Sequence, residues 1–398
     1  VPLGAFLSGG IDSGLVVSYM ADTLPSVVTT SVGFGDRAHN ELAAASLTAE
    51  HLRTVHYPEQ VEPQIASVLD PVAASFDEPF ADSSAVPTQY VSALARTHVT
   101  VALSGDGGDE VFGGYGFRYV PHLLEHRLRG PLHAIGAARL LSQAGRRWPR
   151  GSRVPRWLRL GTYMENLGGE AADAYYADIC FLKPQATGIL MGLGADSDHR
   201  NRESYSMVRS AYTKCRSADP VQRAQYADLH IYLPNDVLVK VDRMSMLHSL
   251  EVRSPLLDHR VIEMAFRIPR TMKLKGLEAK HLLKVLARRR LPSPLLTIPK
   301  HGFTAPVARW IAEHAGTLRE DVLGQHSVAA EFVDVRVARR WLQEHVAGRA
   351  DHSYPLWALW MLHKWNVNCR APRVAPVAAL GREALGPDSS VAVPSASR

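Results

Sequence analysis

The feature that most constrains the fold is a glycine turn near the start of the chain. A short apolar run at 4–7 leads into SGGIDSG at 8–14, and an amphipathic segment follows. This order predicts a strand, a turn and a helix, with Asp12 or Ser13 near the helix N-cap. Gly9 and Gly10 allow a sharp turn and a close backbone approach to a ligand. The free N–H groups then form an anion site without the lysine of a Walker loop, and an ordinary βα turn is the alternative.

The same pattern returns about a hundred residues later. The strand-like run 99–103 is followed by Ser-Gly-Asp-Gly-Gly-Asp-Glu at 104–110. Strand-like runs at 4–7, 27–34, 53–57 and 99–103 alternate with helix-like segments at 13–21, 40–51, 61–69 and 84–96. This alternation predicts an α/β fold with a twisted parallel sheet and helices on its faces. Ligands of such sheets bind beyond the carboxyl ends of the strands, where both Ser-Gly turns should lie.

The remainder of the chain reads as mostly helical. We expect a nucleotide-binding α/β core at 1–120, an Arg-rich helical insertion at 121–220, a helical C-terminal part at 221–370 and a disordered tail at 371–398. Prolines at 234, 255, 269, 292 and 294 should interrupt the helical pattern. Trp357, Trp360, Met361, Lys364 and Trp365 recur at helical spacing and predict a stripe that faces the core.

Charge and cysteine usage restrict the class of protein. The net charge is +6, and nine arginines with no acid lie between Arg127 and Arg159. Such a run can bind nucleic acid or a membrane surface, but a solvated helix face is the commoner reading, and no aromatic platform for nucleic acid accompanies it. The three cysteines are far apart, and no run of about 18 apolar residues occurs. We therefore expect a cytoplasmic protein without a membrane span, a zinc site or a nucleic-acid partner.

Five ordered motifs carry a resemblance to a known family. They are SGGIDS at 8–13, SGDGGDEVFGGY at 104–115, VKVDRMSM at 239–246, LEVRSPLLD at 250–258 and PKHGF at 299–303. Together they resemble the synthetase domain of the asparagine synthetase family, which belongs to the PP-loop, or N-type, ATP pyrophosphatases. The resemblance covers roughly residues 3 to 365, and it implies a PP-loop sheet followed by a mostly helical part.

The resemblance implies ATP and Mg²⁺ as cofactors. Asp12 and Asp109, one from each Ser-Gly turn, would supply the carboxylates for Mg²⁺, with phosphate oxygens and waters completing the shell. For Asp12, helix capping is the competing role. The positions that match the family's ATP site are Leu7, Ser8, Gly9, Gly10, Asp12, Ser13, Val32, Ser104 and Gly105.

Two residues match catalytic positions of the family. Lys300, between Pro299 and Gly302, would offset charge that builds on the α-phosphate and on the acyl intermediate. Taken without the family, a lone loop lysine is usually solvated. Asp106 lies where the family often carries glutamate. Weaker matches predict acceptor-site roles for Asp82, Ser83, Asp242, Arg243, Glu251 and Arg253; the last four are alternatively ion pairs that tie the helical part to the sheet.

The function implied is amide formation from aspartate and ammonia with cleavage of ATP to AMP and pyrophosphate. A complete family member begins with a glutaminase domain bearing an N-terminal cysteine, and no such domain precedes the sheet here. We expect truncation at the amino end, with ammonia taken from solution or from a separate glutaminase domain or subunit; a homodimer is one assembly left open. The alternatives are the same adenylation of another carboxylate, as in β-lactam-forming, peptide-cyclising or cell-surface amidating relatives, and a non-catalytic nucleotide-binding remnant.

Overall fold

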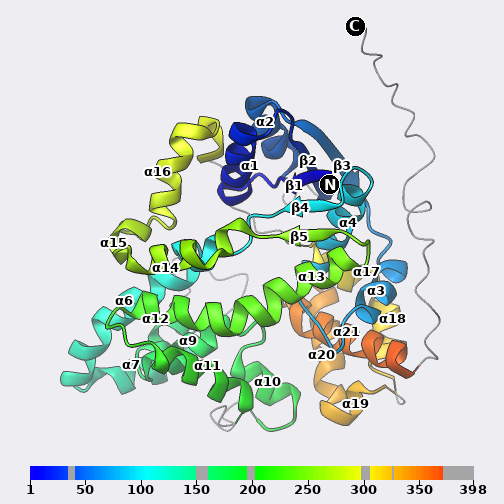
Figure 1. Cartoon of the computed structure of the whole chain (residues 1–398). Helices are drawn as coiled ribbons and strands as arrows, with labels where there is room; N and C mark the ends of the chain where they lie inside the picture. The colour runs from blue at the N-terminus through cyan, green and yellow to red at the C-terminus, as the bar shows by residue number, and fades with distance from the viewer. Residues whose placement is uncertain (35–40, 149–159, 195–201, 297–304, 325–326, 371–398) are drawn as a thin grey trace, which may run out of the picture.

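A five-stranded parallel sheet forms the centre of the N-terminal part. This computed structural model describes residues 1–34, 41–148, 160–194, 202–296, 305–324 and 327–370. The strands are β1 (Leu3–Phe6), β2 (Val28–Phe34), β3 (Val55–Val61), β4 (Val101–Leu103) and β5 (Glu251–Arg253), in the order β3-β2-β1-β4-β5. All neighbouring strands pair in parallel, as Figure 1 shows. The predicted α/β class is confirmed.

Alternating side chains of β1 fix the layers around the sheet. Ala5 and Leu7 pack with α1 (Ile11–Thr23) and α2 (Leu42–Leu52), whereas Phe6 packs on the other face with α4 (Ala85–Arg96). This arrangement follows from the two-residue period of a strand, because both faces of a parallel sheet are covered by helices. Both faces being apolar explains the unbroken hydrophobic run at the start of the chain.

Two sheet features differ from the sequence expectation. β5 was not predicted; it is three residues long and pairs with β4 from Val101↔Glu251 to Leu103↔Arg253. The third strand extends through Val61, which was predicted to begin a helix, and α3 (Ile65–Ala74) starts four residues later. That prediction was wrong because pairing with β2 continues to Phe34↔Val61.

A long helical run crosses beneath the sheet in Figure 1. It comprises α12 (Pro220–Ala227), the π-helix η4 (Asp228–Val237) and α13 (Leu238–Met246) without a break. Pro234 was expected to interrupt the helix, but it lies inside η4. Proline lacks the N–H of a regular helical bond, and wide π-turns are commonly found where a helix serves a functional site.

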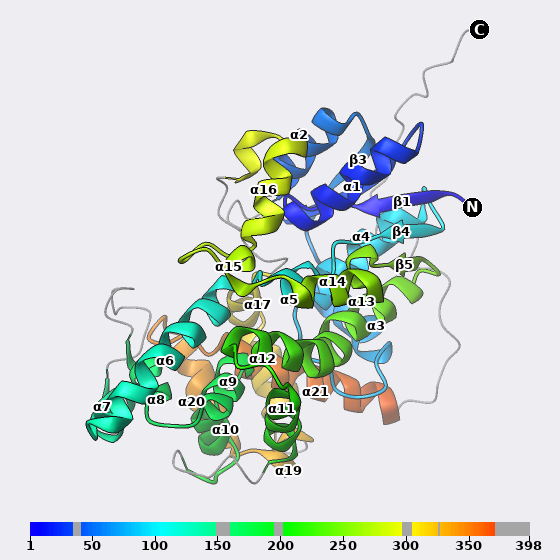
Figure 2. The ribbon, with the colours of Figure 1, turned by 60° about the vertical axis from the view of Figure 1, so that its left-hand side comes forward.

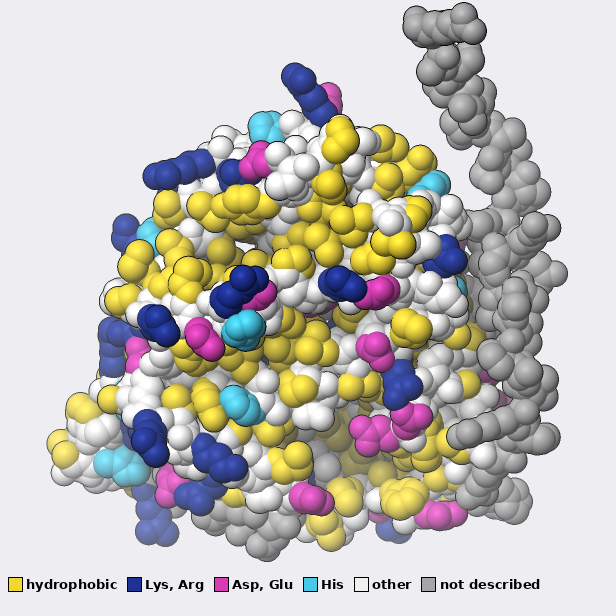
Figure 3. All heavy atoms as spheres, in the orientation of Figure 1, with side chains coloured by type: hydrophobic (Ala, Val, Ile, Leu, Met, Phe, Trp, Pro, Cys, Tyr) yellow, Lys and Arg dark blue, Asp and Glu magenta, His cyan; other side chains and the backbone are white. Residues whose placement is uncertain are grey.

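The predicted insertion consists of helices in the part that the structure describes. They are α6 (Gly116–Ala134), which begins shortly before residue 121, α7 (Ala137–Arg147), α8 (Gly161–Asn166), α9 (Ala171–Ile179), α10 (Pro184–Leu190) and α11 (Glu203–Lys214). The short helix α5 (Gly108–Phe112) precedes the insertion. Figure 2 shows α6 and α7 at one edge of the molecule. Lys and Arg side chains outnumber acidic ones on that side in Figure 3. The division into domains itself remains a prediction.

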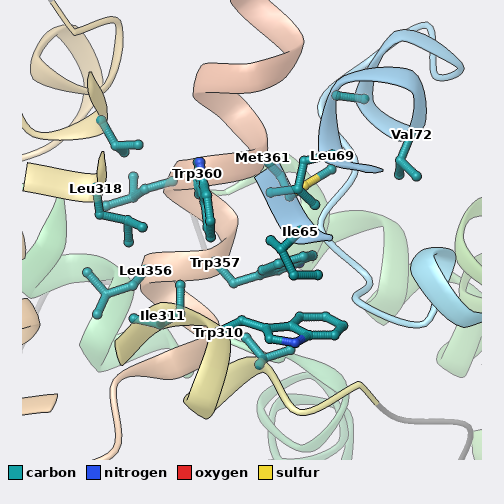
Figure 4. Close-up of a cluster of buried hydrophobic side chains, with 14 of the residues drawn as sticks. Ile65, Leu69, Val72, Trp310, Ile311, Leu318, Leu356, Trp357, Trp360 and Met361 are labelled. Carbon is teal, nitrogen blue, oxygen red and sulfur yellow. The ribbon is translucent and has the colours of Figure 1, made fainter. Parts of the chain in front are cut away.

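The C-terminal part builds its own core around three tryptophans. Trp310, Trp357 and Trp360 are each 1% exposed and pack with Ile65 and Leu69 of α3 (Figure 4). They lie on α17 (Val307–Glu313) and α21 (Ser353–Arg370). The core-facing stripe predicted for α21 is therefore confirmed. None of the described helices is both long enough and apolar enough to span a membrane.

The remaining elements are short connectors and peripheral helices. They are η5 (Pro255–Leu257), α14 (His259–Arg267), α15 (Arg270–Lys273), α16 (His281–Arg290), η6 (Ser293–Leu296), α18 (Ala315–Thr317), η7 (Leu318–Val322), α19 (Ala329–Phe332) and α20 (Val335–Val346). Among them α16 matters most for the site, because it packs beside α1, as both ribbon views show.

Candidate active site

The first Ser-Gly turn joins β1 to α1 and is held by its own hydroxyls. The hydroxyl oxygens of Ser8 and Ser13 lie 2.9 Å apart, and the N–H of Gly10 donates to Ser8 Oγ at 3.2 Å. Helix α1 begins at Ile11 with Gly10 as N-cap, and no side chain caps it. Asp12 therefore lies in the first helical turn, and its carboxylate is not used for capping. A Cβ on Gly9 would lie 2.5 Å from Ala44, so this turn has room only for glycine.

The second Ser-Gly turn packs directly against the first. A Cβ on Gly105 would lie 2.6 Å from the backbone nitrogen of Ser13, and one on Gly108 would lie 2.6 Å from Asp12 Cγ. Gly107, at φ +86°, caps α5, which carries Asp109 in its first turn. The predicted meeting of the two turns at one edge of the sheet is confirmed, and glycine is required there by backbone contact.

A lysine that sequence reasoning missed joins the two carboxylates. Lys280 Nζ forms an ion pair with Asp12 Oδ2 and another, at 2.7 Å, with Asp109 Oδ1. The Lys280 side chain is 7% exposed. Burial alone would lower its pKa, but Asp12 and Asp109 outweigh that effect and raise the pKa of Lys280 above its usual value. The sequence offers little indication of this role, because Lys280 simply precedes a helix, α16, whose last turn is rich in arginine.

The two carboxylates fit a divalent cation bound together with phosphate. Asp12 Oδ1 is buried and makes no hydrogen bond among the described residues, so it has an acceptor to spare. In the same described part, no group of three or more His, Cys, Asp or Glu side chains forms a complete metal site. Mg²⁺ accepts this arrangement, because it is usually held by one or two carboxylates together with phosphate oxygens and waters. Asp12 and Asp109 would hold it.

A second polar cluster surrounds Lys240 of α13. Lys240 Nζ donates to Asp82 Oδ2 at 2.8 Å and to Ser84 Oγ at 2.7 Å. Asp82 also accepts from the N–H and hydroxyl of Ser84. Burial opposes ionisation of Asp82, but Lys240 and these hydrogen bonds hold its pKa below the usual range. Asp82 was predicted to lie in the acceptor site, whereas no role was predicted for Lys240, which belongs to the motif at 239–246.

Two further carboxyls face this cluster. Burial and the nearby charge of Asp82 raise the pKa of Asp236, on the π-helix, to about 7. Its Oδ2 atom is buried and accepts no hydrogen bond from the residues that the structure describes. Burial also raises the pKa of Asp106; Ser104 and Lys240 oppose that rise, while Asp12 and Asp109 add to it. Asp106 thus links the two clusters electrostatically. Asp236 was missed, because the sequence gives no sign of the π-turn that carries it.

The other predicted nucleotide-site residues lie along the same strands. Leu7 and Val32 are 1% and 6% exposed, so their side chains belong to the core. Ser104 is buried, and its hydroxyl lies 2.9 Å from the hydroxyl of Ser254 after β5. Backbone groups of Leu7, Val32 and Ser104 remain the part that a nucleotide could contact. Ser83, predicted for the acceptor site, is buried beside Asp82 just before the N-cap of α4.

The charged residues of the two later motifs were predicted either to line the acceptor site or to form ion pairs, and three of the four form ion pairs. Arg243 pairs with Asp77, while Asp242 is exposed on α13. Glu251 and Arg253 pair with each other at 2.7 Å on the edge strand β5, with side chains 53% and 69% exposed. None of these pairs includes a residue of either polar cluster. Lys300 lies outside the described residues, and its role remains a prediction.

The fold and the site define a parallel α/β protein with two glycine turns and two carboxylates at the carboxyl edge of the sheet, which is where ligands of such folds bind. The family model for asparagine synthase matches residues 1–366. The chain therefore belongs to the asparagine synthase family, and the resemblance inferred from its motifs is confirmed.

Curated relatives support this membership. The chain is 32% identical over 369 residues to asparagine synthetase [glutamine-hydrolyzing] 1 of Bacillus subtilis. The matched residues make up 92% of this chain and 56% of that protein. It is 32% identical over 372 residues to a putative asparagine synthetase [glutamine-hydrolyzing] of Mycobacterium tuberculosis, with 92% of this chain and 54% of that protein covered. The fungal amidase chry2 of Gibberella zeae is 22% identical over 78% of this chain and 50% of its own length. The chain thus spans about half the length of the curated relatives it matches.

Proposed function

We propose that the chain adenylates the side-chain carboxylate of aspartate with ATP and passes the acyl group to ammonia, giving asparagine, AMP and pyrophosphate. The observation that carries this proposal is the contact between the two Ser-Gly turns, which places Asp12, Asp109 and Lys280 at one point. Backbone N–H groups and hydroxyls of the first turn suit the phosphates. Mg²⁺, when bound, would neutralise phosphate charge there.

The second cluster supports an acceptor that carries both signs of charge. Lys240 offers an ammonium, and Asp82 and Asp236 offer carboxyls within the same polar group. An amino acid such as aspartate presents an ammonium and carboxylates, so it can pair with both. Asp106 interacts electrostatically with Lys240 of this cluster and with Asp12 and Asp109 at the phosphate end, which supports a place for it near the point where the reacting carboxylate would meet the α-phosphate. Ammonia would come from solution or from a glutaminase domain or subunit.

The position of ATP cleavage tests the proposal. With ATP, Mg²⁺, ammonium chloride and L-aspartate labelled with ¹⁸O in its side-chain carboxylate, we expect AMP and pyrophosphate in equal amounts. One labelled oxygen should appear in AMP, because the carboxylate oxygen that attacks the α-phosphorus leaves with AMP when ammonia displaces it. Mass spectrometry of the nucleotides measures this transfer.

Three other outcomes would contradict the proposal in different ways. Aspartate-dependent ADP and phosphate would exclude adenylation chemistry. Pyrophosphate release with another carboxylic acid, but not with aspartate, would keep the adenylation and change the acceptor. The absence of pyrophosphate with every acid tested would favour a non-catalytic nucleotide-binding protein.

Asp236 predicts a pH dependence of acceptor binding. Its raised pKa, about 7, leaves the carboxyl neutral below pH 7 and ionised above it. If it receives the ammonium of aspartate, the KM for aspartate should fall roughly tenfold between pH 6 and pH 8, because the ionised fraction rises by that factor. Pyrophosphate formed in a single turnover without ammonium, measured at varied aspartate, gives the half-saturating aspartate concentration in place of the KM and avoids the titration of ammonia. Asp236→Asn should show a high KM that is independent of pH over this range; a dependence equal to that of the parent would assign the titration to another group.

A further inference from the structure

A pocket outside the proposed active site has a buried lysine in its wall. It lies between α12, the end of α14 and α15, and its volume is about 380 Å³. Lys273, the last residue of α15, lines it and is only 2% exposed. No residue of either Ser-Gly turn lines this pocket. Its volume lies in the range of sites for small molecules.

The ammonium of Lys273 has weak partners within the described part of the chain. Lys273 Nζ lies 3.4 Å from Gln225 Oε1 and 4.9 Å from the centre of the Phe266 ring, and it forms no ion pair with a carboxylate there. Burial lowers the pKa of Lys273 to about 8, and Asp219 opposes this only in part. A buried ammonium without a counter-charge is costly, so its surroundings favour an anion.

The carboxylate in the pocket wall is already engaged. Asp219 caps α12 by accepting the N–H of Val221 at 2.9 Å, and its other oxygen accepts from Arg270 Nε at 2.8 Å. Arg267 adds a further positive charge to the lining. The pocket therefore has an excess of positive charge, which an incoming anion would neutralise.

We propose that this pocket binds a small organic carboxylate, with Lys273 and Arg267 taking its oxygens. The ring of Phe266 and the side chains of Ile268 and Pro269 supply apolar walls for a chain of a few carbons. This combination of a few charged groups with apolar walls is typical of sites for organic acids. The proposal is independent of the reaction assigned to the Ser-Gly turns.

The pocket is connected to the active site through one side chain. Gln225, whose Oε1 faces Lys273, donates from Nε2 to the carbonyls of Glu110 at 2.6 Å and Val111 at 3.0 Å. Both carbonyls belong to α5, which carries Asp109. A bound carboxylate would accept the hydrogen bond that Lys273 now donates to Gln225 Oε1. Its binding would therefore change the contacts of Gln225, a residue that supports α5.

Binding of butyrate to the whole chain tests the proposal. We expect saturable binding of one butyrate by isothermal titration and no binding of the neutral butyramide. Lys273→Met should weaken binding by about tenfold or more, the loss typical of a hydrogen bond to a charged group. Lys275→Met, on an exposed lysine two residues away, serves as the matched control and should bind like the parent.

The folding of each variant is checked by circular dichroism. If Lys273→Met does not fold, Arg267→Gln tests the proposal instead, because Arg267 is exposed and its replacement leaves the core unchanged. Arg267→Gln should weaken the binding of butyrate several-fold. Butyrate binding that is absent, or that is unaltered in the folded Lys273→Met and Arg267→Gln variants, would overturn the proposal. Binding of inorganic phosphate without butyrate would overturn the assignment to a carboxylate.

Discussion

Replacing Asp12 or Asp109 by asparagine is expected to lower aspartate-dependent pyrophosphate release by roughly a thousandfold, since the charge stabilisation supplied by a bound metal amounts to several kcal/mol. The substitution keeps the shape of the side chain and removes its charge. Each variant should stay folded, because Lys280 contacts both carboxylates and keeps one ionised partner. The effect should therefore be on metal binding and turnover, and the fold should be preserved.

Two measurements separate these effects. The rise in melting temperature caused by Mg²⁺ in the presence of a non-hydrolysable ATP analogue should be present in the parent and lost in Asp12→Asn and Asp109→Asn. Asp22→Asn is the matched control, because Asp22 lies on the same helix as Asp12 but pairs with Arg290 on the surface. Near-normal turnover of Asp12→Asn or Asp109→Asn at limiting Mg²⁺ would exclude that residue as a ligand.

Replacing Lys300 by alanine is expected to lower kcat by about 10²–10³ while ATP binding stays within a few-fold of the parent. The first value is typical for the loss of one electrostatic donor that acts on charge developing in the transition state. Such a group contributes little to binding of the ground state, so rate and affinity should separate. Rapid-quench measurement of the acyl-adenylate, together with direct titration of ATP, gives both values.

Two variants sharpen the test of Lys300. Lys300→Arg restores the charge with a different shape, and we expect poor rescue because a guanidinium does not replace a compact ammonium. Lys214→Ala removes an exposed lysine at the end of α11 and should leave both kcat and the affinity for ATP unchanged. Pyrophosphate release by Lys300→Ala at the rate of the parent would make this lysine an ordinary surface residue.

The first hundred residues were largely predictable, because their signals are local. Strand, turn and helix follow one another within a few residues, and each is marked by apolar period or by glycine. The exception has a physical cause: Val61 continues β3 because a partner strand is present. Later in the chain, β5 exists only because β4 offers it hydrogen bonds. Three residues at an edge carry no periodicity that a sequence could show.

The candidate site was predictable where glycines and carboxylates occur in one motif. Asp12 and Asp109 could be identified because each follows a Ser-Gly turn. Lys280 could not, because it lies 268 residues from Asp12 and a lysine before a helix is usually solvated. Lys240 lies in sequence near Asp242 and Arg243, and Asp236 lies four residues before it. Only helix orientation separates Lys240 and Asp236 from the exposed Asp242 and from the surface pair of Arg243 with Asp77.

The sequence by itself determined the α/β class, the family and the two turns, because glycine, serine and aspartate at fixed spacing leave few alternative local structures. Only the tertiary structure decided which charges meet. Burial lowers the pKa of both lysines, but the charges of Asp12 and Asp109 outweigh that effect and raise the pKa of Lys280. Lys273 has no such carboxylate pair, and burial lowers its pKa to about 8. Two lysines seven residues apart thus have pKa values shifted in opposite directions. The physical reason is that a buried charge is governed by its partners in space, and these come from distant parts of the chain.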